Sequence, residues 1–189
     1  MIAALLAAAL TCNNGSTQME LDFCSAQAAK IAAADERAAY GAARVRFARK
    51  PARLRVLVAS EQLWQRARDA ACAFDAQLVA GGSIQPLVEA NCAEHAARAR
   101  IADLARLLPA RTSASAIPSP ASAHEHARIY GLLELLVTPS ERALLARSER
   151  VWLRYRRTTC SYARADCATV ATQARTQQLK DSWPAEPFW

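Results

Sequence analysis

Two stretches of this sequence decide its fold: Leu57–Cys72 reads LVASEQLWQRARDAAC, and Leu145–Cys160 reads LARSERVWLRYRRTTC. Aligned without a gap, the two stretches share these identical pairs: Leu57/Leu145, Ser60/Ser148, Glu61/Glu149, Trp64/Trp152, Arg66/Arg154, Arg68/Arg156 and Cys72/Cys160. Two of the 4 tryptophans fall in register, which chance alignment explains poorly. We therefore predict two copies of one structural module.

Each copy has the pattern of a helical hairpin. Leu57, Glu61, Trp64, Arg68 and Cys72 follow spacings that place them on one helix face. The chain is rich in alanine and has only 5 glycines in 189 residues, a composition that favours helices over strands. We predict an all-α fold of two small antiparallel modules with about three helices each, near 25–48, 52–79, 84–107, 124–136, 139–162 and 166–181.

Turn and cap residues support these boundaries. Gly81 and Gly82 mark the turn after the first long helix, and Ser83 is a candidate cap for the helix that follows. Thr138, Pro139 and Glu141 have the spacing of a capping box with proline in the first helical turn.

The 6 cysteines predict three disulfides. Both copies continue with the same spacing, Cys92-x7-Arg100-x3-Leu104 and Cys167-x7-Arg175-x3-Leu179. In two antiparallel helices, the numbers of two residues that lie opposite each other always add to the same total. If Cys72 lies opposite Cys92, then Arg100 lies opposite Trp64. If Cys160 lies opposite Cys167, then Arg175 lies opposite Trp152. This agreement predicts the disulfides Cys72–Cys92 and Cys160–Cys167, and elimination leaves Cys12–Cys24. The spacing of a zinc site is missing from the sequence.

The amino end has the pattern of an export signal. Residues 2–10 form an uncharged apolar stretch that is too short to cross a bilayer, and Ala7-Ala8-Ala9 suits signal-peptide cleavage. No basic residues precede the stretch, which leaves open a start further upstream. Together with the even cysteine count, it predicts a secreted or periplasmic protein with 1–11 as signal peptide.

The rest of the chain divides around a linker. Residues 109–123 are rich in proline, serine and alanine, which is typical of an extended connection. We expect a first module at 12–108, a degenerate second copy at 124–183 and a proline-broken aromatic tail at 184–189.

The motif Glu61-x2-Trp64-x3-Arg68-Asp69-x2-Cys72, with the later Gly-Gly-Ser turn, Cys92 and Arg100, resembles the LprI-type lysozyme-inhibitor amino-terminal domain family. The second copy departs from this pattern, because it lacks the Gly-Gly-Ser turn and Arg157 replaces the acidic residue. The resemblance implies an exported bacterial helical domain, possible contact with lysozyme or another envelope protein, and a cysteine pair at Cys12 and Cys24. That pair competes with acylation of Cys12, since Ala9-Leu10-Thr11-Cys12 weakly imitates a lipoprotein cleavage site.

The recurring motif residues are expected to form a packing scaffold rather than a binding groove. In this interpretation Trp64 anchors the hairpin, while Arg68 or Arg100 stacks on its ring and pairs with Glu61. The scaffold set is Glu61, Trp64, Arg68, Arg100, Glu149, Trp152, Arg156 and Arg175.

No catalytic, cofactor or metal site is singled out. His124 and His126 lack the spacing of a zinc metalloprotease helix, and the phosphate-binding and nucleophile-elbow motifs are missing. With every cysteine paired, no thiol nucleophile remains. We expect a protein that is not an enzyme and that needs no cofactor.

Charge suggests a second kind of partner. The formal net charge is +7, although an arginine excess also follows from genome composition. The alternative to lysozyme inhibition is a module that binds anionic envelope surfaces such as lipid, phosphate-bearing polymer or peptidoglycan. Its candidate contacts are Arg44, Arg46, Arg49, Lys50, Arg53 and Arg55. Nucleic acid is not an expected partner, because the basic residues are not interleaved with aromatic ones.

Overall fold

The structure is a computed structural model that describes residues 12, 17–106, 117–161, 163 and 166–182. Within these ranges every regular element is a helix: α1 Gln18–Phe47, α2 Pro51–Gln77, α3 Gln85–Arg106, α4 Pro120–Leu136, α5 Pro139–Cys160 and α6 Cys167–Asp181. The all-α prediction is therefore confirmed. The predicted signal peptide, most of the predicted linker and the aromatic tail lie outside the described residues.

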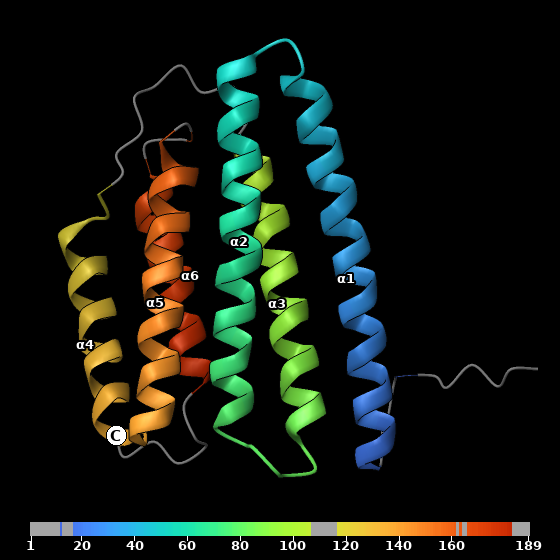
Figure 1. Cartoon of the computed structure of the whole chain (residues 1–189), viewed down its shortest axis with the longest axis vertical. Coiled ribbons are helices and arrows are strands. Elements are labelled where there is room, and N and C mark those ends of the chain that lie inside the picture. The colour runs from blue at the N-terminus through green and yellow to red at the C-terminus, as the bar shows by residue number, and fades with distance from the viewer. Residues whose placement is uncertain (1–11, 13–16, 107–116, 162, 164–165, 183–189) are drawn as a thin grey trace, which may run out of the picture.

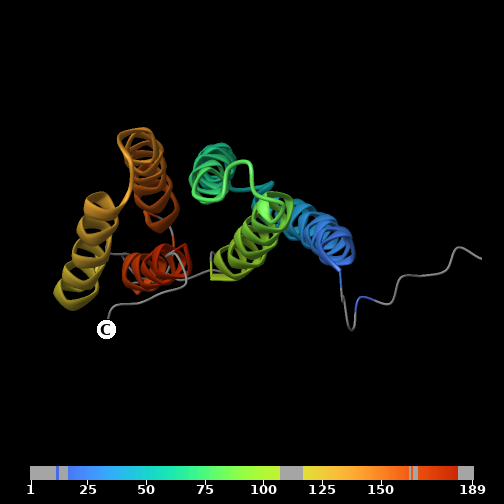
Figure 2. The ribbon, with the colours of Figure 1, turned by 90° about the horizontal axis from the view of Figure 1, so that it is seen from below.

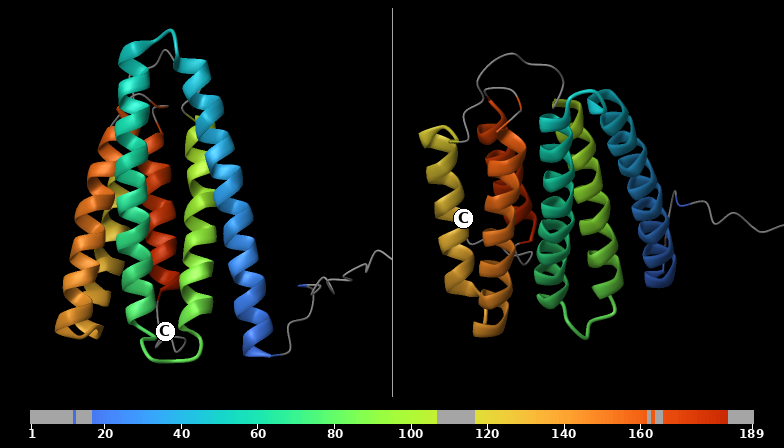
Figure 3. Two further views of the ribbon diagram at one scale, coloured as in Figure 1. Left: turned by 45° about the vertical axis from the view of Figure 1, so that its right-hand side comes forward. Right: turned by 45° about the horizontal axis from the view of Figure 1, so that its top comes forward.

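The six helices run roughly side by side, with α1 at one edge and α4 at the other (Figure 1). Seen along the helices, α1, α2 and α3 form one group and α4, α5 and α6 a second group (Figure 2). The two groups meet where α2 packs against α5, and the side views in Figure 3 show these helices next to each other.

Two helix starts correct the boundaries expected from the sequence. Helix α1 begins at Gln18 instead of near residue 25, because Thr17 and Glu20 form a capping box that satisfies the first backbone N–H groups. Helix α4 begins at Pro120 instead of residue 124, because Ser119 caps it and proline suits the first helical turn. The last four residues of the predicted linker are therefore helical.

Of the other turn and cap predictions, those at Thr138 and Gly81 agree with the structure, and the one at Ser83 does not. Thr138 and Glu141 form the predicted capping box at the start of α5. Gly81 adopts a left-handed conformation with φ of 79°, which glycine accepts at little cost. Ser83 is not the residue directly before α3, since the helix begins at Gln85 and Ile84 precedes it.

The three predicted disulfides, Cys12–Cys24, Cys72–Cys92 and Cys160–Cys167, are present. The second joins α2 to α3, and the third joins the end of α5 to the start of α6. Each hairpin is therefore closed covalently next to its turn, which compensates for the small cores that alanine-rich helices provide.

Three hydrophobic clusters hold the helices together, and each draws on both halves of the chain. The central cluster contains Trp64 and Ala67 from α2 with Trp152 and Tyr155 from α5. These are two equivalent pairs of the sequence repeat, so the repeat meets itself at this point. The division into modules at 12–108 and 124–183 stays a prediction, but the cores are not divided along it.

The two outer clusters are copies of each other at opposite ends of the α2–α5 contact. One contains Phe47, Leu57 and Leu104 together with Cys160 of the other half. The second contains their counterparts together with Phe74 of the first half: Val137, Leu145 and Leu179. Leu57 thus meets the end of α5 while Leu145 meets the end of α2, so the equivalent helices pack antiparallel. This is the arrangement of an internal, approximate twofold axis between α2 and α5.

No helix among the described residues is long and apolar enough to span a membrane.

Candidate functional site

A buried polar cluster occupies the middle of the first hairpin. Arg100 on α3 is fully buried, and its guanidinium donates to Glu61 Oε2 at 3.0 and 3.1 Å and to Ser60 Oγ at 3.0 Å. A fourth bond, of 3.2 Å, goes to the hydroxyl of Tyr155 from the other half. That hydroxyl in turn donates to Asp103 on α3.

The ring of Trp64 lies between two guanidinium groups. The Arg68 guanidinium carbon is 5.0 Å from the ring centroid, and that of Arg100 is 5.9 Å away. Arg100 thus lies near the ring of Trp64, as the hairpin register required. Arg68 is also held by Asp69 at 2.7 Å, so it is fixed between an aromatic face and a carboxylate.

The electrostatics of this cluster favour charged Arg100. Burial acts to lower the pKa of Arg100, but Tyr155 and Glu61 raise it above the ordinary value. Burial and the nearby Asp103 carboxylate raise the pKa of Tyr155, so its hydroxyl keeps its proton. Arg100, Tyr155, Glu61, Ser60 and Asp103 thus form one connected hydrogen-bond network.

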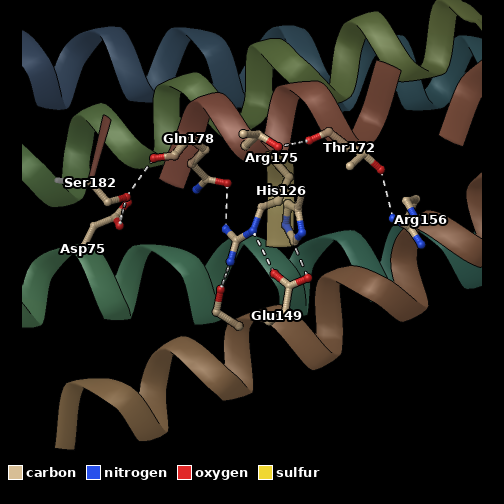
Figure 4. Close-up of polar contacts among 10 residues, drawn as sticks. Asp75, His126, Glu149, Arg156, Thr172, Arg175, Gln178 and Ser182 are labelled. Carbon is tan, nitrogen blue, oxygen red and sulfur yellow. Dashed lines mark hydrogen bonds and ion pairs between the residues drawn. The ribbon is translucent and has the colours of Figure 1, made fainter. Parts of the chain in front are cut away.

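The second hairpin contains an equivalent cluster (Figure 4). Arg175 on α6 donates to Ser148 Oγ, to Glu149 Oε2 at 3.4 Å and to Gln178 Oε1 at 2.9 Å. Arg156 lies 4.9 Å from the centroid of the Trp152 ring and donates to Thr172 at 2.9 Å. The contacts of Arg100 with Ser60 and Glu61, and of Arg68 with Trp64, thus recur at the equivalent positions of the second copy.

One difference between the clusters is a residue before the repeated tyrosine, where the first copy has Glu36 and the second has His126. Both residues stand four before the repeated Tyr-Gly pair, at Tyr40 and Tyr130. His126 stacks on Trp152, with ring centroids 5.1 Å apart, and its Nε2 is 3.5 Å from Glu149 Oε1. Burial raises the pKa of Glu149, but His126 and Arg175 together hold it below the ordinary value.

The pKa of Glu36 is shifted in the opposite direction from that of Glu149. Glu36 is buried, and its Oε1 has no hydrogen-bond partner in the part of the chain that the structure describes. Burial first, and then the charge of Glu61, raises the pKa of Glu36 above its ordinary value. A histidine at this position can compensate a glutamate, whereas a second glutamate repels it.

The predicted basic residues lie away from both clusters, around the connection between α1 and α2. Arg44 lies 5.9 Å from the Tyr40 ring centroid, and Arg53 lies at the same distance from the Phe47 ring. The remaining members are exposed: Arg46, Arg49, Lys50 and Arg55. This connection lies at one end of the helical bundle (Figure 1).

Sequence reasoning missed the residues that join the halves. Tyr155 takes the place of Ala67 in the repeat, and nothing in the register of one hairpin shows that it reaches Arg100. The sequence signal that could have identified Tyr155 is the change from a small residue, Ala67, to a large one on the buried side of the repeated helix. The spacing of His126 argues only against a zinc site, although its place four residues before Tyr130 marks it as the counterpart of Glu36.

Among the described residues no group of histidine, cysteine, aspartate and glutamate could hold a metal ion. Arg100 and Arg175 are paired with Glu61 and Glu149, so these two ion pairs stabilise the fold.

A known family matches the part of the chain that contains the first hairpin. The family model described as "Lysozyme inhibitor LprI" matches residues 11–104. The amino-terminal half of this chain belongs to the LprI family. The LprI match contains Glu61, Trp64, Arg68 and Arg100, the residues of the first buried cluster. No curated protein and no solved structure gave a significant match.

Proposed function

We propose that this protein is an exported, non-catalytic inhibitor of lysozyme that acts by protein–protein contact. The observation that carries the proposal is the LprI family match over residues 11–104, since the family description is that of a lysozyme inhibitor. The three disulfides support export, because such bonds persist in oxidising compartments.

The contact would use exposed residues, because the buried arginines are already paired. Glycosidase clefts present a pair of carboxylates, and an inserted guanidinium can pair with them. With a formal net charge of +7, however, the protein would be repelled at long range by a basic lysozyme. Inhibition of a basic lysozyme should therefore strengthen as salt screens the repulsion.

The test is lysozyme activity in the presence of excess purified, oxidised protein. Two substrates are needed, a bacterial cell-wall suspension and a small soluble oligosaccharide. Loss of activity on both supports occlusion of the cleft. Undiminished activity on the soluble substrate contradicts the proposal, even if cell-wall lysis slows, because a basic protein can also protect walls by coating them.

A second candidate function, binding to anionic envelope surfaces, has its own observation. Between Glu36 and Glu61 the chain contains no acidic residue, and this segment comprises the end of α1, the α1–α2 connection and the start of α2. Six basic residues therefore lie together at one end of the bundle: Arg44, Arg46, Arg49, Lys50, Arg53 and Arg55. Retention on anionic vesicles that collapses with rising salt, and that is lost when these residues are neutralised, would support this function.

A further inference from the structure

The solvent face of α5 carries a row of four arginines, Arg147, Arg150, Arg154 and Arg157. Their spacings of 3, 4 and 3 place them on one side of the helix, opposite the buried Glu149 and Trp152. All four are exposed, and among the described residues none makes a side-chain hydrogen bond or a salt bridge. At the rise of an α-helix the row extends over about 15 Å. We name it the α5 arginine row.

The first copy of the repeat shows that the hairpin does not need this row. The corresponding positions on α2 are Ala59, Gln62, Arg66 and Asp69, whose charges cancel. The α5 arginine row has four positive charges at the same positions. Over the same stretch the buried serine, glutamate and tryptophan, and the arginine that stacks on the tryptophan, are identical in both copies. The second copy thus keeps the scaffold while its solvent face differs by four charges.

One end of the row lies at the same end of the bundle as the other basic region of the molecule, the α1–α2 connection. The cluster that contains Phe47 and Leu57, which flank the α1–α2 connection, also contains Cys160 at the end of α5. The Arg157 end of the row therefore faces the same end of the bundle as that connection. None of the large exposed hydrophobic side chains lies on α5 in the described structure, so the row has no apolar side chains to insert into a bilayer.

We propose that the α5 arginine row binds a linear, phosphate-bearing polymer. Guanidinium groups bind phosphate through paired, charge-assisted hydrogen bonds. A row of evenly spaced cations along a straight helix matches a chain of regularly spaced anions, whereas a flat membrane would contact a broad patch with apolar residues. This proposal does not depend on inhibition of lysozyme.

The experiment uses the full oxidised protein and long-chain inorganic polyphosphate as the probe. Affinity is measured by titration at several salt concentrations for the wild type and for the variant R147Q/R150Q/R154Q/R157Q. We expect the variant to bind roughly ten-fold or more weakly and to show a shallower dependence of affinity on salt, because fewer counterions are released. Exposed positions of this kind change stability little, and circular dichroism verifies the fold.

A charge-matched control, R37Q/R66Q/R98Q/R128Q, removes four exposed arginines elsewhere and should retain more than half of the wild-type affinity. Equal weakening of both variants would overturn the proposal, since net charge alone would then explain binding. Unchanged polyphosphate affinity of the α5 variant would overturn it as well. Tighter binding to phosphatidylglycerol vesicles than to polyphosphate at equal phosphate, dependent on the same four arginines, would contradict the polymer as the occupant.

Discussion

At the scale of single residues, the fold depends on two arginines that are buried because each is fully paired. Arg100 and Arg175 each contact a serine and a glutamate that are neighbours in sequence on the adjacent long helix. A buried guanidinium that keeps its carboxylate is tolerated, but one that loses it is left as an uncompensated charge. The repeated Ser-Glu pair therefore determines whether each hairpin can close around its arginine.

Replacing Glu61 with alanine should lower the free energy of unfolding by about 3–5 kcal/mol, because Arg100 remains buried without its carboxylate. Glu149→Ala should have the same sign of effect through Arg175. Urea unfolding followed by circular dichroism measures both changes. Asp69→Ala is the matched control: its ion pair with Arg68 is exposed, and its loss should cost at most about 1 kcal/mol. A shift near zero for Glu61→Ala would contradict the role assigned to the buried pair.

Glu36→Gln should stabilise the protein at neutral pH. The pKa of Glu36 is raised in the folded state by burial and by Glu61, so the folded protein binds this proton more tightly than the unfolded chain does. Stability from this group is then present at acid pH and is lost as pH rises through the folded-state pKa. The variant and the wild type should unfold alike below about pH 4.5, the ordinary pKa, and diverge above it in favour of the variant. A pH-independent difference would show that the raised pKa is not the cause.

At the scale of helices and hairpins, covalent closure and end caps set the boundaries. Thr17 with Glu20 begins α1, and Thr138 with Glu141 begins α5. The Cys72–Cys92 disulfide connects two helices whose turn contains Gly81 in a left-handed conformation. Each hairpin is thus specified by short-range features that can be recognised in sequence.

Converting Cys72 and Cys92 together to serine should lower the free energy of unfolding by about 3 kcal/mol, given the 20-residue separation that the bond spans. The same change at Cys160 and Cys167 should cost less, about 2 kcal/mol, because that loop spans 7 residues. Parallel urea titrations of both double variants measure the difference. A larger loss from the shorter loop would show that constraint of the unfolded chain is not the main contribution.

The helices and their pairing within a hairpin could be predicted because they follow from periodicity, repeat register and cysteine spacing. Arg100 could be placed near Trp64 in this way. The early start of α1 was missed although Thr17 and Glu20 have the capping-box spacing. Contacts between the halves could not be predicted, because register within one hairpin says nothing about which face meets the other copy. Tyr155, which reaches Arg100 from the other half, belongs to that part.

At the scale of the whole molecule, the two copies form an internal pair about an approximate twofold axis. Helices α2 and α5 are equivalent and pack antiparallel, so each half completes the hydrophobic clusters of the other. One polar contact across the contact surface is asymmetric, since Tyr155 reaches Arg100 whereas its counterpart is Ala67. The first hairpin therefore depends on the second for both packing and a hydrogen bond.

Tyr155→Phe should lower the free energy of unfolding by about 1–3 kcal/mol, because the hydroxyl joins Arg100 and Asp103 in a buried network. Urea unfolding measures the loss. Combining the change with Glu61→Ala should cost less than the sum of the single effects, since both act on Arg100. Strict additivity would indicate that the hydroxyl does not support this arginine.

The most direct test of the central claim, that the two copies share one folded body, is hydrogen exchange of the slowest amides in wild type and Glu149→Ala. The substitution lies in the second copy, and its buried partner Arg175 lies there as well. Shared cores predict that the slowest amides of α2 and α5 lose protection together and by the same factor. Loss of protection confined to α4, α5 and α6, with α2 unchanged, would contradict the claim.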